Sequence, residues 1–538
     1  MAHGTSNNRT SAMSATIKIL SNSLFGLRST DRPIPWWVTL IISLAYVAGG
    51  AIGTAKLYNW WNQPLLVDNQ HYFYIAERAA SGVPPHISNF DPKHHASSLL
   101  SAVGIDVGRL VDFNDVRSTR VVSLLLFGSS LAAIWLLVST MTGSPLAGHV
   151  GAAALWSFSL LSYHASMGSR PKVFLVGLLL WSLYALAKRK PFLTGVLGAA
   201  SYFCWQPGLL VLGAAAPVFL LGKNRWRSLM WLSLGSLLCV LVYEGYFARY
   251  GLTTIREQLF QTVTFPAEYM SHQTGGFPGF RPAFEKLKRT WNGSFPQSTI
   301  IAQTAAGAAA LFWIVLLVLP FRVVRFLLRE PIWIACGLCL YVSVAFTYYD
   351  HQGPPDLFFM LPFLAIAAAA AFASVMRGLL AASEWKHLRY VTLGVRVLGA
   401  AAGVALIALF LSRGFDGSKR WKSYRYTLDD QYALSARVAQ MHAQGRTILA
   451  IRCTHLMGMA RLENYTNYGF VFPGLQDYLT QRGAVPFNPV RDEKLPGIIL
   501  EARLKPSSYV GKWLRANYQP LRDPSFARQG IRKWIPRR

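Results

Sequence analysis

The stretch from Val67 to His95 reads VDNQHYFYIAERAASGVPPHISNFDPKHH and follows the first long apolar segment of the chain. It places charged and titratable side chains close to where a membrane surface is expected, namely Asp68, Asp91, Lys93, His94 and His95. Charged groups beside lipid are costly to desolvate, so a cluster of them at that depth indicates a functional site.

The composition of the whole chain indicates a membrane protein. The 538 residues are 52% hydrophobic and 14% charged, whereas a soluble domain has about 25% charged residues. A net charge of +29 would suggest a nucleic-acid partner in a soluble protein. In a membrane protein, Lys and Arg gather in cytoplasmic loops and attract anionic lipid, and the sequence has no nucleic-acid-binding motif. Membrane lipids, and no nucleic acid, are therefore the expected partners.

Residues 1–35 are polar and basic and are expected to form a cytoplasmic tail. Crossing a membrane takes about 20 apolar residues, and 36–55 is the first such run. Further apolar runs lie at 119–141, 145–163, 173–187, 191–222, 228–247, 298–320, 331–349, 356–376 and 390–412. Trp205-Gln206-Pro207-Gly208 should break the long run 191–222 into two spans. The pattern predicts about eleven transmembrane helices over 36–412.

The charges of the short loops predict the orientation of these helices. Basic residues fill the loops that alternation places inside, at 188–190, 222–227, 322–330 and 377–389. Basic loops remain in the cytoplasm, so the outer loops 57–118 and 248–297 and the tail 413–538 are expected outside it. This is the topology of a multi-pass protein of the plasma (inner) membrane, with its active site and C-terminus extracytoplasmic.

The tail 413–538 is not hydrophobic enough to cross a membrane. Residues 428–444 have helical apolar spacing, while 447–451, 497–500 and 530–536 have strand-like composition. These patterns predict a small extracytoplasmic α/β domain. The expected fold is therefore an all-α polytopic membrane protein with a small α/β domain at its C-terminal end.

The first outer loop also carries a recognisable frame: Asp68, a Tyr, an Ala, then Gly82-x-Pro84 and Asp91-Pro92-Lys93. This frame resembles the first extracytoplasmic loop of the GT-C membrane glycosyltransferases, of the protein mannosyltransferase and aminoarabinose transferase type. The resemblance implies a hexosyltransferase-class enzyme that takes a sugar from a polyprenyl-phosphate carrier. It also implies that the first-loop Asp is the catalytic carboxylate.

Asp68 is the expected general base. Inverting transfer from a lipid phosphate needs a carboxylate within hydrogen-bond reach of the acceptor hydroxyl. Asp68 follows a span by a few residues and should lie near a lipid phosphate. The structural alternative is an interfacial Asp that caps a helix over 69–80.

The Asp91-Pro92-Lys93-His94-His95 segment is the second candidate. We expect Asp91 to orient the site and Lys93 and His94 to bind the substrate near the leaving phosphate. The alternative for the cations is an ordinary solvated loop. Asp and His are metal-ligand types, but no distant third ligand is evident in the sequence. No cofactor is expected, although metal-dependent members of the resembling family leave a divalent metal open.

Two further segments on the outer side supply candidate substrate-binding residues. Arg170 and Lys172 open a span, and a leaving phosphate needs such cations, Arg as a bidentate donor and Lys as a point charge. Cations at a membrane boundary can instead be snorkelling anchors. Part of the resembling family has an acidic residue here, which leaves the second carboxylate open. His351, in a loop that resembles a late outer loop of the family, is expected to touch phosphate or acceptor unless the loop is an ordinary turn.

These observations favour transfer of a sugar from a polyprenyl-phosphate carrier to a glycan, lipid or protein acceptor on the extracytoplasmic face. The sequence has no P-loop or GxGxxG stretch, which disfavours a nucleotide-sugar enzyme. One rival is a transporter or flippase of lipid-linked glycans, which should have broken spans in matching positions of two halves. Only the break at 206–208 is found. A glycan ligase or polymerase, the other rival, would carry its mechanistic loop late in the chain.

Overall fold

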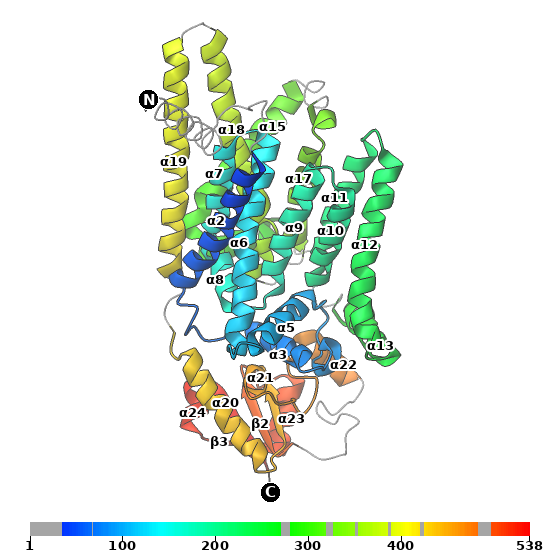
Figure 1. Cartoon of the computed structure of the whole chain (residues 1–538). Helices are drawn as coiled ribbons and strands as arrows, with labels where there is room; N and C mark the ends of the chain where they lie inside the picture. Colours follow the sequence, from blue (N-terminus) through cyan, green and yellow to red (C-terminus); the bar gives the residue numbers. More distant parts are fainter. Residues whose placement is uncertain are drawn as a thin grey trace, which may run out of the picture.

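The computed structural model describes residues 35–66, 68–270, 280–318, 326–349, 353–385, 389–419, 424–481 and 496–537. Long helices form a bundle, a small α/β domain lies beyond one end of it, and α3 and α5 lie between the two (Figure 1). The candidate site is built at this junction.

The bundle is that of a multi-pass membrane protein. Within the described residues, five helices are long and apolar enough to cross a membrane: α2 (Trp36–Leu57), α6 (Asp115–Thr142), α12 (Arg225–Ala248), α18 (Leu361–Trp385) and α19 (Arg389–Lys419). A bent pair, α8 (Ser159–Met167) and α9 (Pro171–Ala187), gives a sixth candidate. The remaining bundle helices are α7 (Pro145–Trp156), α10 (Pro191–Cys204), α11 (Leu209–Leu220), α15 (Thr299–Val318) and α17 (Ile332–Tyr349). The number of spans, about eleven, remains a prediction.

Two of the expected spans are interrupted. The break expected at 205–208 is present, because α10 ends at Cys204 and the 3₁₀ turn η1 (Gln206–Gly208) precedes α11. The run 145–163, expected to be continuous, is instead divided between α7 and α8. Helix α19 passes close to this division: a Cβ on Gly414 would lie 2.7 Å from the Trp156 ring.

The loops predicted to lie outside the cytoplasm, called the outer loops below, fold into short helices around the junction. The first loop contains α3 (Asp68–Ala80), α4 (Pro85–Ser88) and α5 (Ala96–Arg109). Later outer segments contribute α13 (Leu252–Leu259), the π-helical turns η2 (Phe260–Thr264) and η3 (Pro266–Met270), α14 (Phe280–Ser294), and the 3₁₀ turns η4 (Pro296–Ser298) and η5 (Pro354–Phe359). The end of the bundle opposite the α/β domain holds the connection from α11 to α12, the C-terminal end of α18 and the N-terminal end of α19 (Figure 1).

The C-terminal domain has a four-stranded sheet in the order β1-β2-β4-β3. Strands β1 (Ile448–Ile451) and β2 (Ile498–Ala502) are parallel, and β4 (Ile531–Pro536) pairs antiparallel with β2 and with β3 (Tyr518–Leu521). Its helices are α20 (Leu428–Ala443), α21 (His455–Met459), α22 (Pro473–Gln481), α23 (Tyr509–Asn517) and α24 (Pro524–Arg528). The expected strands are present. β3 was not expected, since it is a mostly exposed edge strand containing Pro520.

Apolar contacts join this domain to the first outer loop. β1 and β2 are buried along their whole length, as is usual for parallel strands covered on both faces. Phe90 of the first loop is buried in the same cluster as Leu449 and Ile499, and Tyr74 of α3 belongs to the cluster on the other side of the sheet. The Tyr74 hydroxyl also accepts the Asn464 backbone N–H at 2.9 Å. Helix α3 is therefore held against the domain.

Candidate active site

Asp68 is the first residue of α3 and is paired with Arg170 across the junction. Arg170 Nη2 donates to Asp68 Oδ2 at 3.0 Å, and Arg170 Nη1 donates to Asn69 Oδ1 at 3.2 Å. The Asp68 side chain keeps 30% of its accessible surface while that of Arg170 keeps 5%. The carboxylate can therefore be reached from outside, whereas the guanidinium is held behind it.

The bend between α8 and α9 brings Arg170 to Asp68. These helices meet at 111°, and Gly168 at the bend has φ +105°, a conformation that other residues adopt only under strain. A Cβ at Gly168 would also lie 2.7 Å from Thr119 Oγ1. Pro171 then starts α9, with Arg170 as the residue before its first turn. The local sequence Gly168-Ser-Arg170-Pro171 thus fixes where the guanidinium lies.

The electrostatic surroundings keep Asp68 ionised. Burial alone would raise its pKa, but the positive charges of Arg170, Lys93 and Lys172 outweigh burial and hold the pKa below its usual value. Asp68 is therefore a carboxylate, able to accept a proton, next to a group of cations.

Asp91 and Lys93 contact α3 through His71 and Tyr72. Asp91 Oδ2 is 3.0 Å from His71 Nε2, and Asp91 Oδ1 accepts the Lys93 backbone N–H at 3.1 Å. Gln261, in η2, accepts the Asp91 backbone N–H at 3.0 Å. Burial would raise the pKa of Asp91, but the hydrogen bond to His71 and the nearby positive charges lower it. Asp91 is thus enclosed by protein contacts, and its role in orienting the site remains a prediction.

Lys93 keeps its charge in this environment. Its Nζ donates to the Tyr72 hydroxyl at 3.1 Å. Burial would lower the pKa of Lys93, but Tyr72, Asp91 and Asp68 raise it. An ammonium group therefore persists beside Asp68 although it is partly buried.

Lys172 completes a group of three cations. It forms an ion pair with Asp356 of η5, and its Nζ lies 4.2 Å from the centre of the Trp205 ring. The next residue, Gln206, donates to the Pro92 backbone oxygen at 3.2 Å. The break between α10 and α11 therefore forms part of the site wall. We call Arg170, Lys93 and Lys172, with their partners Asp68, Tyr72 and Asp356, the membrane-side network.

His94 does not join this network. The His94 ring packs against Tyr202 and Phe203, at centroid distances of 4.8 and 5.3 Å, and burial lowers the pKa of His94 to about 3. His94 is therefore neutral, and its role in substrate binding remains a prediction. His351 lies outside the described residues. Among the residues that are described, no three His, Cys, Asp or Glu side chains are grouped as a metal site would require.

Sequence reasoning missed His71, Tyr72 and Asp356. The first two lie three and four residues after Asp68, which is the spacing of one helix face, so α3 periodicity could have found them. Asp356 pairs with a residue far away in the chain, and no local signal indicates that pairing. Asp356 places an acidic side chain beside the Ser169–Lys172 segment, which contains no acidic residue of its own.

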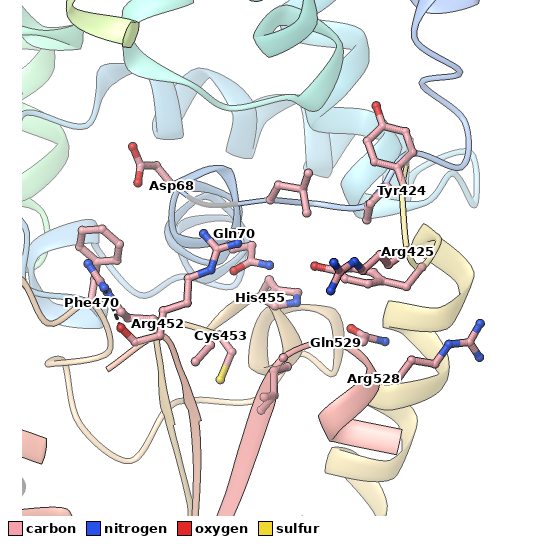
Figure 2. Close-up of a pocket in the computed structure, with 17 residues that line it drawn as sticks. Asp68, Gln70, Tyr424, Arg425, Arg452, Cys453, His455, Phe470, Arg528 and Gln529 are labelled. Atoms are coloured by element: carbon pink, nitrogen blue, oxygen red, sulfur yellow. Dashed lines mark hydrogen bonds between the residues drawn. The ribbon is translucent and has the colours of Figure 1, made fainter. Parts of the chain in front are cut away.

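A cavity of about 440 Å³ opens between Asp68 and the C-terminal domain. Figure 2 shows Asp68 and Gln70 above it and Arg452, Cys453 and His455 below it. The cavity is lined by Pro64, Leu66, Asp68, Gln70, Tyr424, Arg425, Tyr426, Arg452, Cys453, His455, Phe470, Ala502, Arg503, Arg528, Gln529, Gly530 and Ile531. Asp68 thus belongs to the membrane-side network and also lines this cavity.

Comparison with known proteins identifies the fold. No protein-family model and no curated protein sequence matches the chain. The chain is similar to the solved structure of ArnT from Cupriavidus metallidurans bound to undecaprenyl phosphate, with 13% identity and a TM-score of 0.58 over 92% of this chain and 97% of that one. The apo structure of ArnT from Cupriavidus metallidurans gives 13% identity and a TM-score of 0.54, covering 91% and 97%.

These matches show that the chain has the fold of the ArnT structures, in agreement with the fold expected from the resemblance of the first outer loop. The similarity extends over nearly the whole length of both chains, so it includes the C-terminal domain as well as the bundle.

Proposed function

We propose that this protein is a multi-pass membrane glycosyltransferase that takes a sugar from a polyprenyl-phosphate carrier and transfers it to an acceptor on the extracytoplasmic face. The observation that carries the proposal is the Asp68 carboxylate, which lines a cavity and lies among the three cations Arg170, Lys93 and Lys172. The ArnT structure with the same fold is described as bound to undecaprenyl phosphate. A site with a carboxylate and several cations suits a donor of that chemistry.

The membrane-side network is suited to a lipid phosphate. Phosphate oxygens bind strongly to charged donors, with Arg able to offer two parallel N–H groups and Lys a point charge. Arg170 and Lys172 flank the first residue of α9, while Lys93 approaches from the first outer loop. Because each cation already has a protein partner, the network is ordered before a donor arrives, which is how electrostatic catalysis avoids reorganisation.

In the proposed step, the oxygen of an acceptor hydroxyl forms a bond to the anomeric carbon of the sugar. The bond from that carbon to the phosphate oxygen breaks, and its electron pair leaves on the polyprenyl phosphate. Asp68 accepts the hydroxyl proton, and Arg170, Lys93 and Lys172 stabilise the charge that develops on the phosphate. The low pKa of Asp68 suits late proton transfer, because the acceptor oxygen becomes strongly acidic only when its new bond is largely formed.

Mass spectrometry of extracted lipids tests the proposal in cells. Cells that lack the protein should accumulate a polyprenyl-phosphate sugar, and its head-group mass tests the hexosyl expectation. Wild-type protein should clear this lipid, and Asp68→Asn protein at equal abundance should not. Absence of any sugar-linked polyprenyl phosphate would contradict the proposal.

A second measurement separates transfer from transport. A flippase of lipid-linked glycans would also cause accumulation in cells, but it needs two sides of a membrane. Purified protein in detergent micelles, where no sides exist, should still convert the accumulated lipid and an extract of envelope acceptors into polyprenyl phosphate. If it consumes no donor in micelles while clearing it in cells, the transporter is the better account.

A further inference from the structure

The floor of the cavity is formed by the ends of two parallel strands. β1 and β2 are neighbours that run in the same direction, and each is followed directly by an arginine, Arg452 and Arg503. In sheets with parallel strands, ligands bind in the crevice outside the carboxyl ends of the strands. The topology therefore brings two guanidinium groups, from sequence positions about fifty residues apart, to a place where ligands are commonly bound.

Both arginines adopt an unusual backbone conformation. Arg452 has φ +58° and Arg503 has φ +60°, in the left-handed region that non-glycine residues rarely adopt. The Arg452 backbone N–H donates to the Gly469 oxygen at 2.7 Å, and its Nη1 donates to the Arg503 backbone oxygen at 3.3 Å. The two strand ends are thus tied to each other, and the strain is retained at the edge of a cavity.

The cavity carries an excess of positive charge. Among the described residues that line it are four arginines, Arg425, Arg452, Arg503 and Arg528, and one carboxylate, Asp68, which is already paired with Arg170. In the described part of the chain, none of these four arginines forms an ion pair with a carboxylate. Burial lowers the pKa of Arg452, Asp68 raises it, and the like charge of Arg503 lowers it. A bound anion would relieve that repulsion.

The polar side chains of the cavity lie on opposite sides of it. In Figure 2, Asp68 lies on the side of the cavity away from the strand ends, while Arg425 and Gln529 lie across the cavity from Arg452. Gln70, Tyr424, Tyr426 and His455 provide polar surface between them. A volume of about 440 Å³ lies within the usual range for small-molecule sites.

We propose that this cavity is the acceptor site and that the acceptor carries an anionic group, a phosphate or a carboxylate, bound by Arg452 and Arg503 with Arg425 facing them. The inference rests on the proposed function and names the acceptor class. The anion anchors the acceptor at the strand ends, while a hydroxyl on the same molecule extends to Asp68. The donor phosphate occupies the membrane-side network, so donor and acceptor approach Asp68 from opposite sides.

Thermal unfolding of the full-length protein in neutral detergent tests the two sites separately. Undecaprenyl phosphate should raise the Tm of the wild-type protein by binding at the membrane-side network. With that lipid at saturation, titration with inorganic pyrophosphate or with malonate should raise the Tm further, compared with NaCl at equal ionic strength. The more effective of the two anions identifies phosphate or carboxylate as the recognised group.

Substitutions assign the second rise in Tm to the cavity. Arg452→Gln and Arg503→Gln should each weaken anion binding by about tenfold or more, because each removes a charged hydrogen bond. Arg515→Gln, which removes an exposed arginine of α23 outside the cavity, should leave anion binding unchanged. If either strand-end variant unfolds, Arg425→Gln replaces it in the test, because Arg425 is exposed and its backbone is not strained.

The inference is overturned if neither anion raises the Tm beyond the NaCl control. It is also overturned if the cavity variants bind the anion as tightly as the wild-type protein does. Lack of stabilisation by undecaprenyl phosphate contradicts the donor site instead, and with it the proposed function. The two failures are therefore distinguishable in one experiment.

Discussion

The cations on the two sides of Asp68 differ in how they are paired. On the membrane side, Arg170 and Lys172 have carboxylate partners and Lys93 has a tyrosine hydroxyl. On the domain side, the four cavity arginines have no carboxylate ion pair among the described residues. Paired cations are held in fixed positions, whereas unpaired ones leave their donors for a ligand. The difference fits a leaving phosphate stabilised by a prearranged network and an acceptor that supplies its own negative charge.

Asp68 belongs to both sides, and its replacement should have the largest effect. Asp68→Asn keeps the shape of the side chain and one oxygen for Arg170, but it cannot accept a proton. Loss of a general base typically costs about 10² to 10⁴ in rate, so sugar transfer should fall by that factor while undecaprenyl phosphate still binds. Transfer from a synthetic polyprenyl-phosphate sugar, measured with purified protein, gives the rate.

A matched control exists for this substitution. Asp429 lies in the first turn of α20 as Asp68 lies in the first turn of α3, and its side chain is 71% exposed. Asp429→Asn should transfer sugar at the wild-type rate. If Asp68→Asn also retained near-normal turnover, Asp68 would not be the base.

The next largest effect should come from a cation of the membrane-side network. Lys172→Met removes a charge that would stabilise the leaving phosphate, and loss of one such interaction typically costs about 10² to 10³ in rate. The same change leaves the buried Asp356 without its cation, so it should also lower the Tm.

A second variant separates the two consequences. In the double variant Lys172→Met with Asp356→Asn, the Tm should recover because no buried charge is left unpaired, while the rate remains low. Recovery of both would mean that Lys172 serves stability alone. Lys188→Met, at an exposed position at the other end of α9, should change neither.

Arg170 should determine the pH at which activity is lost. Asp68 acts as a base only when ionised, and its pKa lies below the usual 3.8, so wild-type activity should persist down to at least about pH 4. Arg170→Gln removes the first of the charges that oppose burial. An opposite charge within hydrogen-bond distance typically lowers a pKa by about 1 to 3 units, so the acid limb of the pH–rate profile should rise by that amount. An unchanged acid limb would show that Asp68 is not the titrating group.

The smallest expected effect concerns Phe470, which links α3 to the cavity arginine Arg452. Phe470 stacks on His71 with ring centroids 4.5 Å apart, and the Arg452 guanidinium lies 5.6 Å from the same ring. Such contacts contribute about 0.5 to 1.5 kcal/mol each. Phe470→Leu should therefore weaken pyrophosphate binding and slow transfer by about threefold to tenfold. An effect on the rate without one on binding would mean that Phe470 supports only the His71–Asp91 pair.

The sequence was informative where local chemistry determines the structure. Hydropathy and the break at Gln206-Pro207-Gly208 predicted most bundle helices, and the first outer loop indicated the fold that the ArnT structures share. Sequence reasoning could not have assigned Asp356 to Lys172, because they are 184 residues apart and meet only through the packing of η5 on α9.

The arginines of the cavity were missed for a related reason. Arg452 and Arg503 each follow a short strand, and nothing local distinguishes them from the many other basic residues of a chain with a net charge of +29. Arg452 and Arg503 are close together because β1 pairs in parallel with β2. These two strands are neighbours in the sheet but about fifty residues apart in the chain. Only the sheet topology shows that they share one cavity with Asp68.

The most direct test of the account is a structure of the protein with undecaprenyl phosphate bound, determined by cryo-electron microscopy. The account predicts that the phosphate lies within about 2.7–3.2 Å of donors from Lys93, Arg170 or Lys172, next to Asp68, and that the cavity beside Arg452 and Arg503 stays open. A phosphate bound instead at Arg452 and Arg503, with the membrane-side network unchanged, would contradict it.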